Sequence, residues 1–118
     1  MQEPSNSFCT DYQDAWNSFS AIRDSNAASS SDIVLGRDEL LKEWENLAKR
    51  EDAPKAVIAT VPAVANDFVQ AWNATSSGER SSYQRSWKNR QGFIALRCGK
   101  AGHPIEFQGT DIPLRAPA

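Results

Sequence analysis

The chain has 118 residues, of which 40% are hydrophobic and 24% charged, and its formal net charge is -2. This length and composition predict one globular domain with a core large enough to fold without a bound metal. The charge argues against a dedicated nucleic-acid binder, because phosphate contacts need a basic surface, and no apolar run approaches the roughly 20 residues that span a bilayer.

The first residues are polar and carry neither a basic start nor an apolar stretch. Residues 1–6 are therefore expected to form a disordered lead-in and not a signal peptide. Two explanations stay open at this point. Either the protein is cytosolic, or it is exported and its leader lies upstream of the given sequence.

A first helix is predicted from about Ser7 to Asp24, because apolar residues recur there at steps of three and four. Core packing is the expected role of this largely aromatic stripe, which consists of Phe8, Cys9, Tyr12, Trp16, Phe19 and Ile22. The small polar residues from Ser25 to Asp32 indicate a loop.

A second helix follows, and its inward residues are Leu40, Leu41, Trp44, Leu47 and Ala48. Two starting points are compatible with the sequence. Asp32 could cap a longer helix that tolerates Gly36, or the helix could begin near Arg37. The acidic residues Asp38 and Glu39 suit the first turn of the shorter version, which is therefore favoured.

The segment Ala53–Trp72 is predicted to be the central helix. Its apolar face is formed by Ile58, Val61, Val64, Ala65, Phe68 and Trp72. Pro54 occupies a first-turn position, where its missing amide costs no hydrogen bond. Pro62 lies in mid-helix and predicts a kink near Ile58 to Val61.

A fourth helix is predicted from about Glu79 to Cys98, after the break at Asn73 to Gly78, and Gly99 is the expected left-handed terminating residue. Three prolines exclude a long helix from residues 99–118. This irregular tail could still lie across the bundle as a strap, through its apolar residues Ile105, Phe107, Ile112 and Leu114.

Four amphipathic helices with short connections predict an all-α, antiparallel up-down-up-down four-helix bundle over residues 7–98. In that topology, the start of the first helix and the end of the fourth lie together. Cys9 and Cys98 occupy these two places, so a disulfide is expected, and with it an oxidising compartment. The alternative is two buried free thiols in a cytosolic protein.

Four features of the sequence carry a family resemblance: Cys9 in the first helix, a Leu-rich second helix running into Ala53-Pro54, a third helix bearing Val, Ile and Phe, and the terminal Cys98-Gly99. In these features the chain resembles small secreted proteins and lipoproteins of actinobacteria. The resemblance covers about Phe8 to Gly99. It implies a two-cysteine helical domain that follows a leader or a lipid-attachment segment. Most of these relatives have no assigned activity, so the resemblance implies a compartment and a fold more than a role.

Candidate chemistry is sparse. His103 is the only histidine and lies beside glycine and proline, which favours a loop residue over a catalytic one. Haem ligation by His103, Tyr12 or Tyr83 is conceivable but not selected by any motif. No cofactor or metal site is predicted. Two carboxylate pairs share helix faces, and their expected role is solvated surface: Asp11 with Asp14, and Glu39 with Glu43.

Charge is unevenly distributed along the chain. Acidic residues outnumber basic ones in residues 1–52, whereas residues 79–100 carry six cations and a single acid. Complementary packing within the bundle is one explanation. The other is a partner-binding face that meets an acidic protein or an anionic envelope component, formed by Arg80, Arg85, Lys88, Arg90, Arg97 and Lys100.

The sequence therefore favours a non-enzymatic, secreted or cell-surface helical domain that binds a protein or envelope component. One alternative is a carrier that holds an apolar ligand, such as lipid or haem, between its helices. It is motivated by the four tryptophans and by Pro62. Another is a cytosolic partner-binding or inhibitor protein. An enzyme is the least favoured reading.

Overall fold

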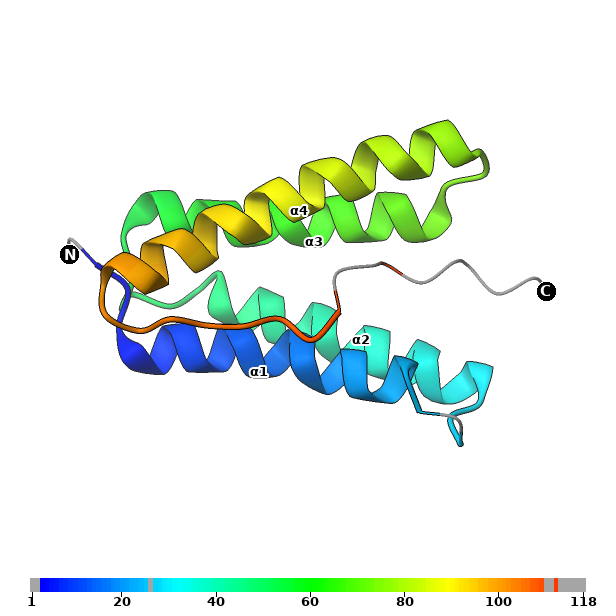
Figure 1. The fold of residues 1–118 in the computed structure, drawn as a ribbon, viewed down its shortest axis with the longest axis horizontal. Coiled ribbons are helices and arrows are strands. Elements are labelled where there is room, and N and C mark those ends of the chain that lie inside the picture. The colour runs from blue at the N-terminus through cyan, green and yellow to red at the C-terminus, as the bar shows by residue number, and fades with distance from the viewer. Residues whose placement is uncertain (1–2, 26, 110–111, 113–118) are drawn as a thin grey trace.

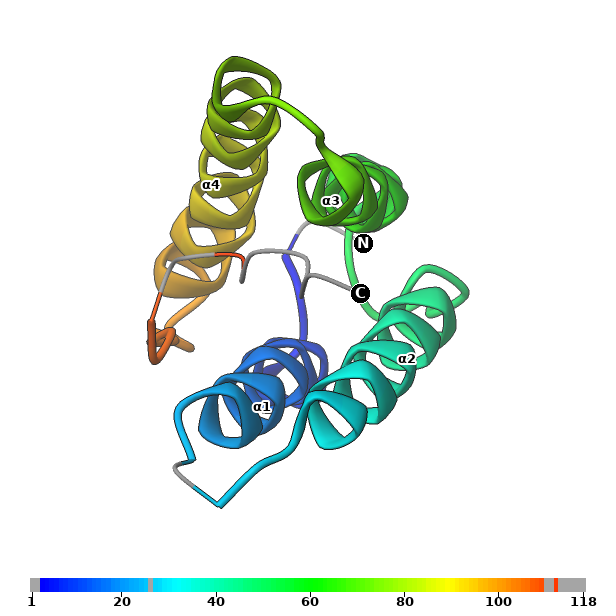
Figure 2. The same cartoon turned by 90° about the vertical axis from the view of Figure 1, so that its right-hand side faces the viewer.

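The computed structural model describes residues 3–25, 27–109 and 112, and these form an all-α fold. Its four helices are α1 (Asn6–Arg23), α2 (Ser30–Leu47), α3 (Lys55–Asn73) and α4 (Ser77–Lys100). Successive helices run in opposite directions and pack side by side, which confirms the predicted up-down bundle (Figure 1). The α1–α2 and α3–α4 pairs contact most extensively, whereas α1 and α4 contact least, as the end-on view shows (Figure 2).

The start of α2 corrects the favoured sequence prediction. The helix begins at Ser30 and passes through Gly36, so the shorter version starting near Arg37 is wrong. A capping box explains the difference: the Ser29 side chain accepts from the Asp32 backbone, and the Asp32 carboxylate accepts from the Ser29 backbone. The longer alternative is correct in extent, although Ser29 and not Asp32 is the cap.

The end of α4 also differs from the prediction. The helix continues through Gly99, and Gly102 is the residue with positive φ, at 85°. The backbone amides of Gly102 and His103 donate to the carbonyls of Gly99 and Cys98 at 3.0 and 2.9 Å. These two bonds form a Schellman motif, so the expected terminating glycine lies three residues later than predicted.

The core is largely aromatic and is centred on Trp16 of α1. Its ring centroid lies 4.7 Å from that of Trp87 and 6.2 Å from that of Phe68. Trp44 of α2 also packs against Phe68, with ring centroids 5.4 Å apart. The segment Ala53–Trp72, predicted as central, supplies Phe68 and runs through Pro62 as one helix from Lys55. All four helices therefore meet around one cluster of rings.

A disulfide joins Cys9 to Cys98, with Cα atoms 5.9 Å apart, across 89 residues of sequence. It links the first turns of α1 to the last turns of α4, at the end of the bundle where the sequence predicted it. The bond is a covalent connection between α1 and α4, which also pack against each other through the rings of Trp16 and Trp87.

The segment after α4 lies along α1, in the gap between α1 and α4 (Figure 1). Side chains of α1 bind its backbone: Asn17 donates to the Glu106 carbonyl at 3.0 Å and accepts from the Gln108 amide at 2.7 Å. Ile112 is buried in the core, whereas Leu114 lies outside the described residues. We call residues 104–109 the strap.

The N-terminal end is tied to the bundle. Pro4 is buried and Ser5 caps α1 by accepting a hydrogen bond from the Phe8 amide. The Ser5 amide also donates to the Asp52 carbonyl, next to the start of α3. Met1 and Gln2 lie outside the described residues.

Candidate partner-binding groove

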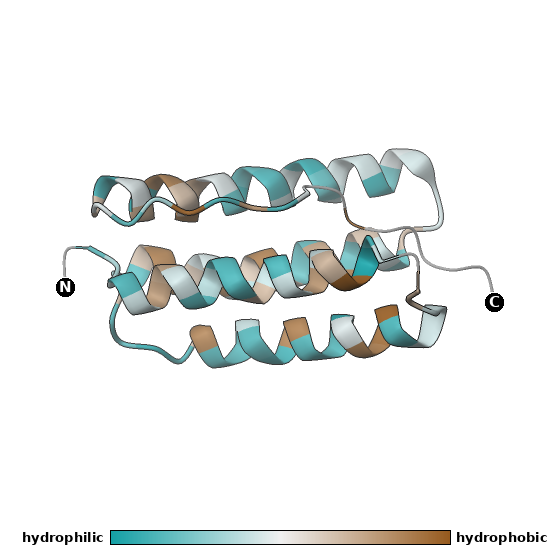
Figure 3. Ribbon diagram, turned by 60° about the horizontal axis from the view of Figure 1, so that its bottom comes forward, coloured by the Kyte–Doolittle hydropathy of each residue, from teal (hydrophilic) through white to brown (hydrophobic). Residues whose placement is uncertain are grey.

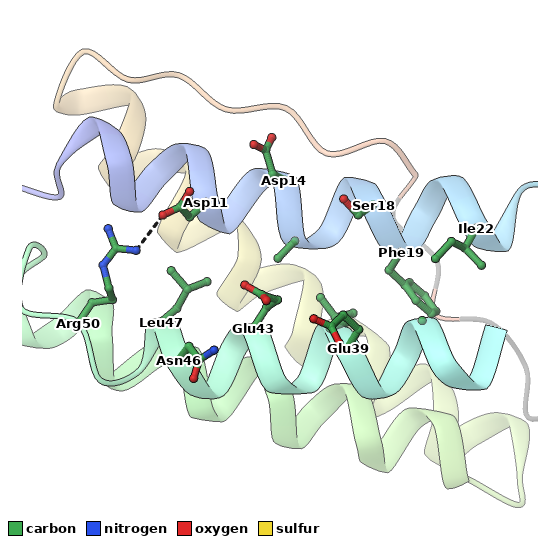
Figure 4. Close-up of a pocket in the computed structure, with 13 residues that line it drawn as sticks. Asp11, Asp14, Ser18, Phe19, Ile22, Glu39, Glu43, Asn46, Leu47 and Arg50 are labelled. Carbon is green, nitrogen blue, oxygen red and sulfur yellow. Dashed lines mark hydrogen bonds and ion pairs between the residues drawn. The ribbon is translucent and has the colours of Figure 1, made fainter. Parts of the chain in front are cut away.

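A groove of about 370 Å³ runs along the outer side of the α1–α2 pair (Figure 4). Its floor is apolar and its rims are polar. The floor is made by Ala15, Phe19, Ile22, Leu40 and Leu47. The rims are Asp11, Asp14 and Ser18 on α1, and Glu39, Glu43, Asn46 and Arg50 on α2 and the turn after it. We call this feature the α1–α2 groove.

Helical periodicity explains why these residues face one another. The α1 residues Asp11, Ala15, Ser18 and Ile22 recur at steps of three and four, so they share one side of the helix. Ala15 and Ser18 are small, which leaves the space between the helices unfilled at these positions. Gly36 lets the helices approach at one end, since a Cβ atom there would lie 3.0 Å from Ile22 Cδ1.

The middle of the groove is acidic. Glu39 and Glu43 lie one turn apart on α2 and project toward α1 (Figure 4). Within the described part of the chain, neither carboxylate has an ion-pair partner. Two like charges one turn apart destabilise a helix by a few tenths of a kcal/mol, so the fold itself does not benefit from this pair.

One end of the groove is apolar and open. The groove continues at Ile22 and Gly36 into a second depression, of about 510 Å³, which is also lined by Ala27, Ala28 and Leu35. Leu35 is 67% exposed, the highest value among the large hydrophobic residues described. Hydrophobic and hydrophilic bands alternate along the helices on this side of the molecule (Figure 3).

The other end of the groove is closed by Arg50. Its guanidinium lies 2.8 Å from Asp11 and 2.6 Å from Asp52, and Figure 4 shows the bond to Asp11. The hydrogen bonds that Arg50 donates to Asp52 hold the pKa of Asp52 at about 2. The same bonds, with the bond that Arg50 donates to Asp11, raise the pKa of Arg50. This end is therefore a satisfied ion-pair network, unlike the middle of the groove.

Sequence reasoning found these carboxylates but not the groove. It placed Asp11 with Asp14 and Glu39 with Glu43 on two separate surfaces. The structure brings both pairs to the rims of one depression, because α1 and α2 are antiparallel neighbours. The small residues Ala15 and Ser18, opposite the acidic turns of α2, are the signal that could have indicated the groove.

Several basic residues of α4 are bound to other groups of the bundle. Arg90 binds the buried carboxylate of Asp67 at 2.8 Å, and the guanidinium of Arg97 lies over the ring of Phe93. Arg80 donates to the Ala74 carbonyl at 3.4 Å. Arg85, Lys88 and Lys100 are exposed. The face predicted to bind partners thus includes residues that hold the bundle together. A depression of about 380 Å³ on this face is lined by polar and charged residues of α4 alone.

The remaining candidates for chemistry are dispersed. The side chain of His103 is half-buried beside the Schellman motif, Tyr12 is buried and hydrogen-bonded to Gln91, and Tyr83 packs against the core. Burial raises the pKa of Tyr12 well above its usual value. Among residues 3–25, 27–109 and 112, no group of three or more His, Cys, Asp or Glu residues could hold a metal ion.

A smaller apolar pocket, of about 240 Å³, lies beside Pro62 and is also lined by Leu41, Trp44, Ala48 and Ala65. Its volume is below the roughly 300–1,000 Å³ typical of small-molecule sites. The tryptophans that motivated the carrier hypothesis pack mainly against one another and against Phe68. The pocket beside Pro62 therefore gives little support to a site for lipid or haem.

Comparisons with known proteins found no matching family model, no matching curated protein and no matching solved structure. None of the helices in the described part of the chain combines the length and apolar character needed to cross a bilayer. The described part of the chain is a small four-helix protein with one disulfide.

Proposed function

We propose that this chain is a non-enzymatic, exported helical domain of the cell envelope that binds a partner protein in the α1–α2 groove. The groove carries this proposal. It combines an apolar floor, rims from two helices and a pair of carboxylates that form no ion pair within the described part of the chain. Binding sites commonly pair an apolar surface with a few polar groups that fix orientation.

The Cys9–Cys98 disulfide supports the export half of the proposal, because such bonds persist in oxidising compartments and are rare in the cytosol. The resemblance to small secreted proteins and lipoproteins of actinobacteria points the same way. Non-reducing mass spectrometry of protein isolated from its native compartment tests it directly. A mass that lacks two hydrogens is expected, and two free thiols in that protein would contradict export.

The groove is preferred over the basic face of α4 for a geometric reason. The α1–α2 groove is formed by two helices and has an apolar floor, whereas the depression on the basic face is lined by polar and charged residues of α4 alone. Arg90 and Arg80 of that face are also engaged within the bundle. An anionic envelope component bound to Arg85, Lys88 and Lys100 is the less favoured form of the proposal.

Site-specific photo-crosslinking in the native host tests the binding half. A photoreactive amino acid at Ser18, on the rim of the groove, should give one discrete adduct with a partner. The same group at Ser82, an exposed residue of α4, should not. Charge reversal by Glu39→Lys with Glu43→Lys should abolish the Ser18 adduct.

The matched control is Glu45→Lys with Glu51→Lys, which changes the net charge equally at exposed positions outside the α1–α2 groove. It should leave the Ser18 adduct unchanged. Equal yields from Ser18 and Ser82, or no adduct from Ser18, would contradict binding in the groove.

A further inference from the structure

We infer that the occupant of the α1–α2 groove is a cationic, amphipathic helix of the partner protein, laid antiparallel to α2. This inference rests on the proposed function and specifies its partner. It starts from the order of chemical groups along the groove: an exposed apolar end at Leu35, then the acids Glu39 and Glu43, then the neutralised Arg50 end.

The spacing of these groups matches a helix. Leu35, Glu39 and Glu43 are each four residues apart, so they follow one stripe of α2 with a rise of about 6 Å per step. A partner helix that lies along this stripe matches the spacing of about 6 Å with residues that are themselves four apart in its sequence. Its matching stripe therefore has one apolar residue and two cations.

The carboxylates of the groove determine which charge the partner helix carries. Among the residues that the structure describes, neither Glu39 nor Glu43 forms an ion pair, whereas Asp11 is already paired with Arg50. Lysine or arginine at the two positions of the partner helix facing Glu39 and Glu43 would complete two ion pairs over an apolar floor, where they are partly screened from water. An acidic helix would be repelled at the same two positions.

The orientation follows from the helix dipoles. The apolar end of the groove lies at the N-terminal half of α2, whose N-terminus carries partial positive charge. A partner helix that brings its C-terminal end there aligns its dipole favourably with that of α2. Its cations then precede its apolar residue, which gives the pattern cation, three residues, cation, three residues, leucine.

The groove is suited to receive side chains of this size. Long cationic side chains can lay their methylene stems on Ala15, Phe19 and Leu40 and hold their charged ends at the acidic rim. Leucine at the apolar end would cover Leu35 and Ile22. This is the arrangement in which an amphipathic helix binds a hydrophobic groove.

Two synthetic helical peptides of identical composition test the inference against the full, disulfide-bonded chain. One carries the predicted pattern, and the other carries the same two lysines and leucine on different faces of the helix. Binding is measured by fluorescence anisotropy at low and at high salt. The patterned peptide should bind about tenfold more tightly, and salt should weaken its binding.

Variants of the chain locate the binding. Glu39→Gln with Glu43→Gln should remove most of the difference between the peptides, while Glu45→Gln with Glu51→Gln should leave it unchanged. Leu35→Ser should weaken the patterned peptide several-fold. Equal binding of both peptides, or an unchanged preference in the Glu39 and Glu43 variant, would overturn the inference.

A second copy of this chain is the competing occupant, because Lys88 precedes the exposed Leu96 by eight residues on α4. Concentration-dependent oligomers in light scattering that disappear with Lys88→Glu would therefore overturn the inference. The crosslinking experiment at Ser18 tests the proposed function separately from the peptide experiment. A groove-specific adduct from Ser18 without a preference for the patterned peptide contradicts only the cationic helix, whereas the absence of that adduct contradicts the groove itself.

Discussion

The guanidinium of Arg90 lies 2.8 Å from the carboxylate of Asp67, which is 5% exposed at the boundary between α3 and α4. Ser86 donates to the same carboxylate at 2.7 Å. A buried carboxylate that loses its cation keeps the cost of its desolvation without the compensating attraction. Arg90 is therefore a stabilising residue of the α3–α4 pair.

Replacing Arg90 with methionine should lower the free energy of unfolding by about 2 kcal/mol, since the arginine is partly exposed and the full cost of a buried pair is about 3–5 kcal/mol. Arg85→Met on the same helix is the control and should change stability by less than about 0.5 kcal/mol. Urea denaturation followed by tryptophan fluorescence measures both. Equal effects of the two substitutions would contradict the structural role of Arg90.

The strap should contribute measurably to stability, because it is held by side chains of α1 and covers the gap beside α4. Asn17→Ala removes two hydrogen bonds to the strap backbone, at 3.0 and 2.7 Å, and should cost about 1–2 kcal/mol. The Gln108 side chain is exposed and serves as the control position, so Gln108→Ala should be nearly neutral.

Removal of residues 104–118 should destabilise more than Asn17→Ala, because it also removes Phe107, whose ring centroid lies 5.9 Å from that of Tyr12. It should also expose the indole nitrogen of Trp16, which donates to the Gly109 carbonyl at 2.8 Å. A red shift of tryptophan emission in the native state checks this. An unchanged unfolding midpoint would show that the strap is not part of the cooperative unit.

Helical periodicity was sufficient to predict the bundle and the disulfide, because both depend on stripes that repeat along each helix. Phe8, Trp16, Val61 and Phe68 lie in the core as their spacing required. With the topology set, the ends of the first and fourth helices had to meet, and Cys9 and Cys98 followed.

The parts that sequence reasoning missed depend on pairs of segments and not on one stripe. The shorter second helix was favoured because Asp38 and Glu39 suit a first turn, but the capping box at Ser29 starts the helix at Ser30. The groove also needed the register of α1 against α2, which periodicity does not give. The stabilising role of Arg90 could not be separated from the basic face of α4 without the position of Asp67.

The disulfide should be a major source of stability. It closes a loop with a sequence separation of 89 residues, and the chain-entropy model assigns roughly 4–5 kcal/mol to a loop of that length. The double variant Cys9→Ser with Cys98→Ser should lose about this amount in urea denaturation. Reductant should lower the stability of the natural chain to a similar level and leave the variant unchanged. Equal stability of the oxidised chain and the variant would contradict the prediction.

Acid should weaken the fold through Asp52. Its pKa is about 2 in the folded chain, because Arg50 donates to its carboxylate, against an ordinary value of 3.8. A carboxylate whose pKa is lowered by folding stabilises the protein above its unfolded-state pKa, so the contribution is complete above about pH 4. It is lost as the pH falls toward 2.

The size of this acid effect is about 1 kcal/mol, after allowance for the 30% exposure of both side chains and the screening that follows from it. Asp52→Asn should remove this part of the pH dependence between about pH 4 and 2 and lower stability at pH 7. Asp38→Asn, at an exposed pair with Arg37, is the control. Urea denaturation curves measured between about pH 4 and 2 test this prediction. If the natural chain and the Asp52 variant lose stability in parallel, other carboxylates are responsible for the acid effect.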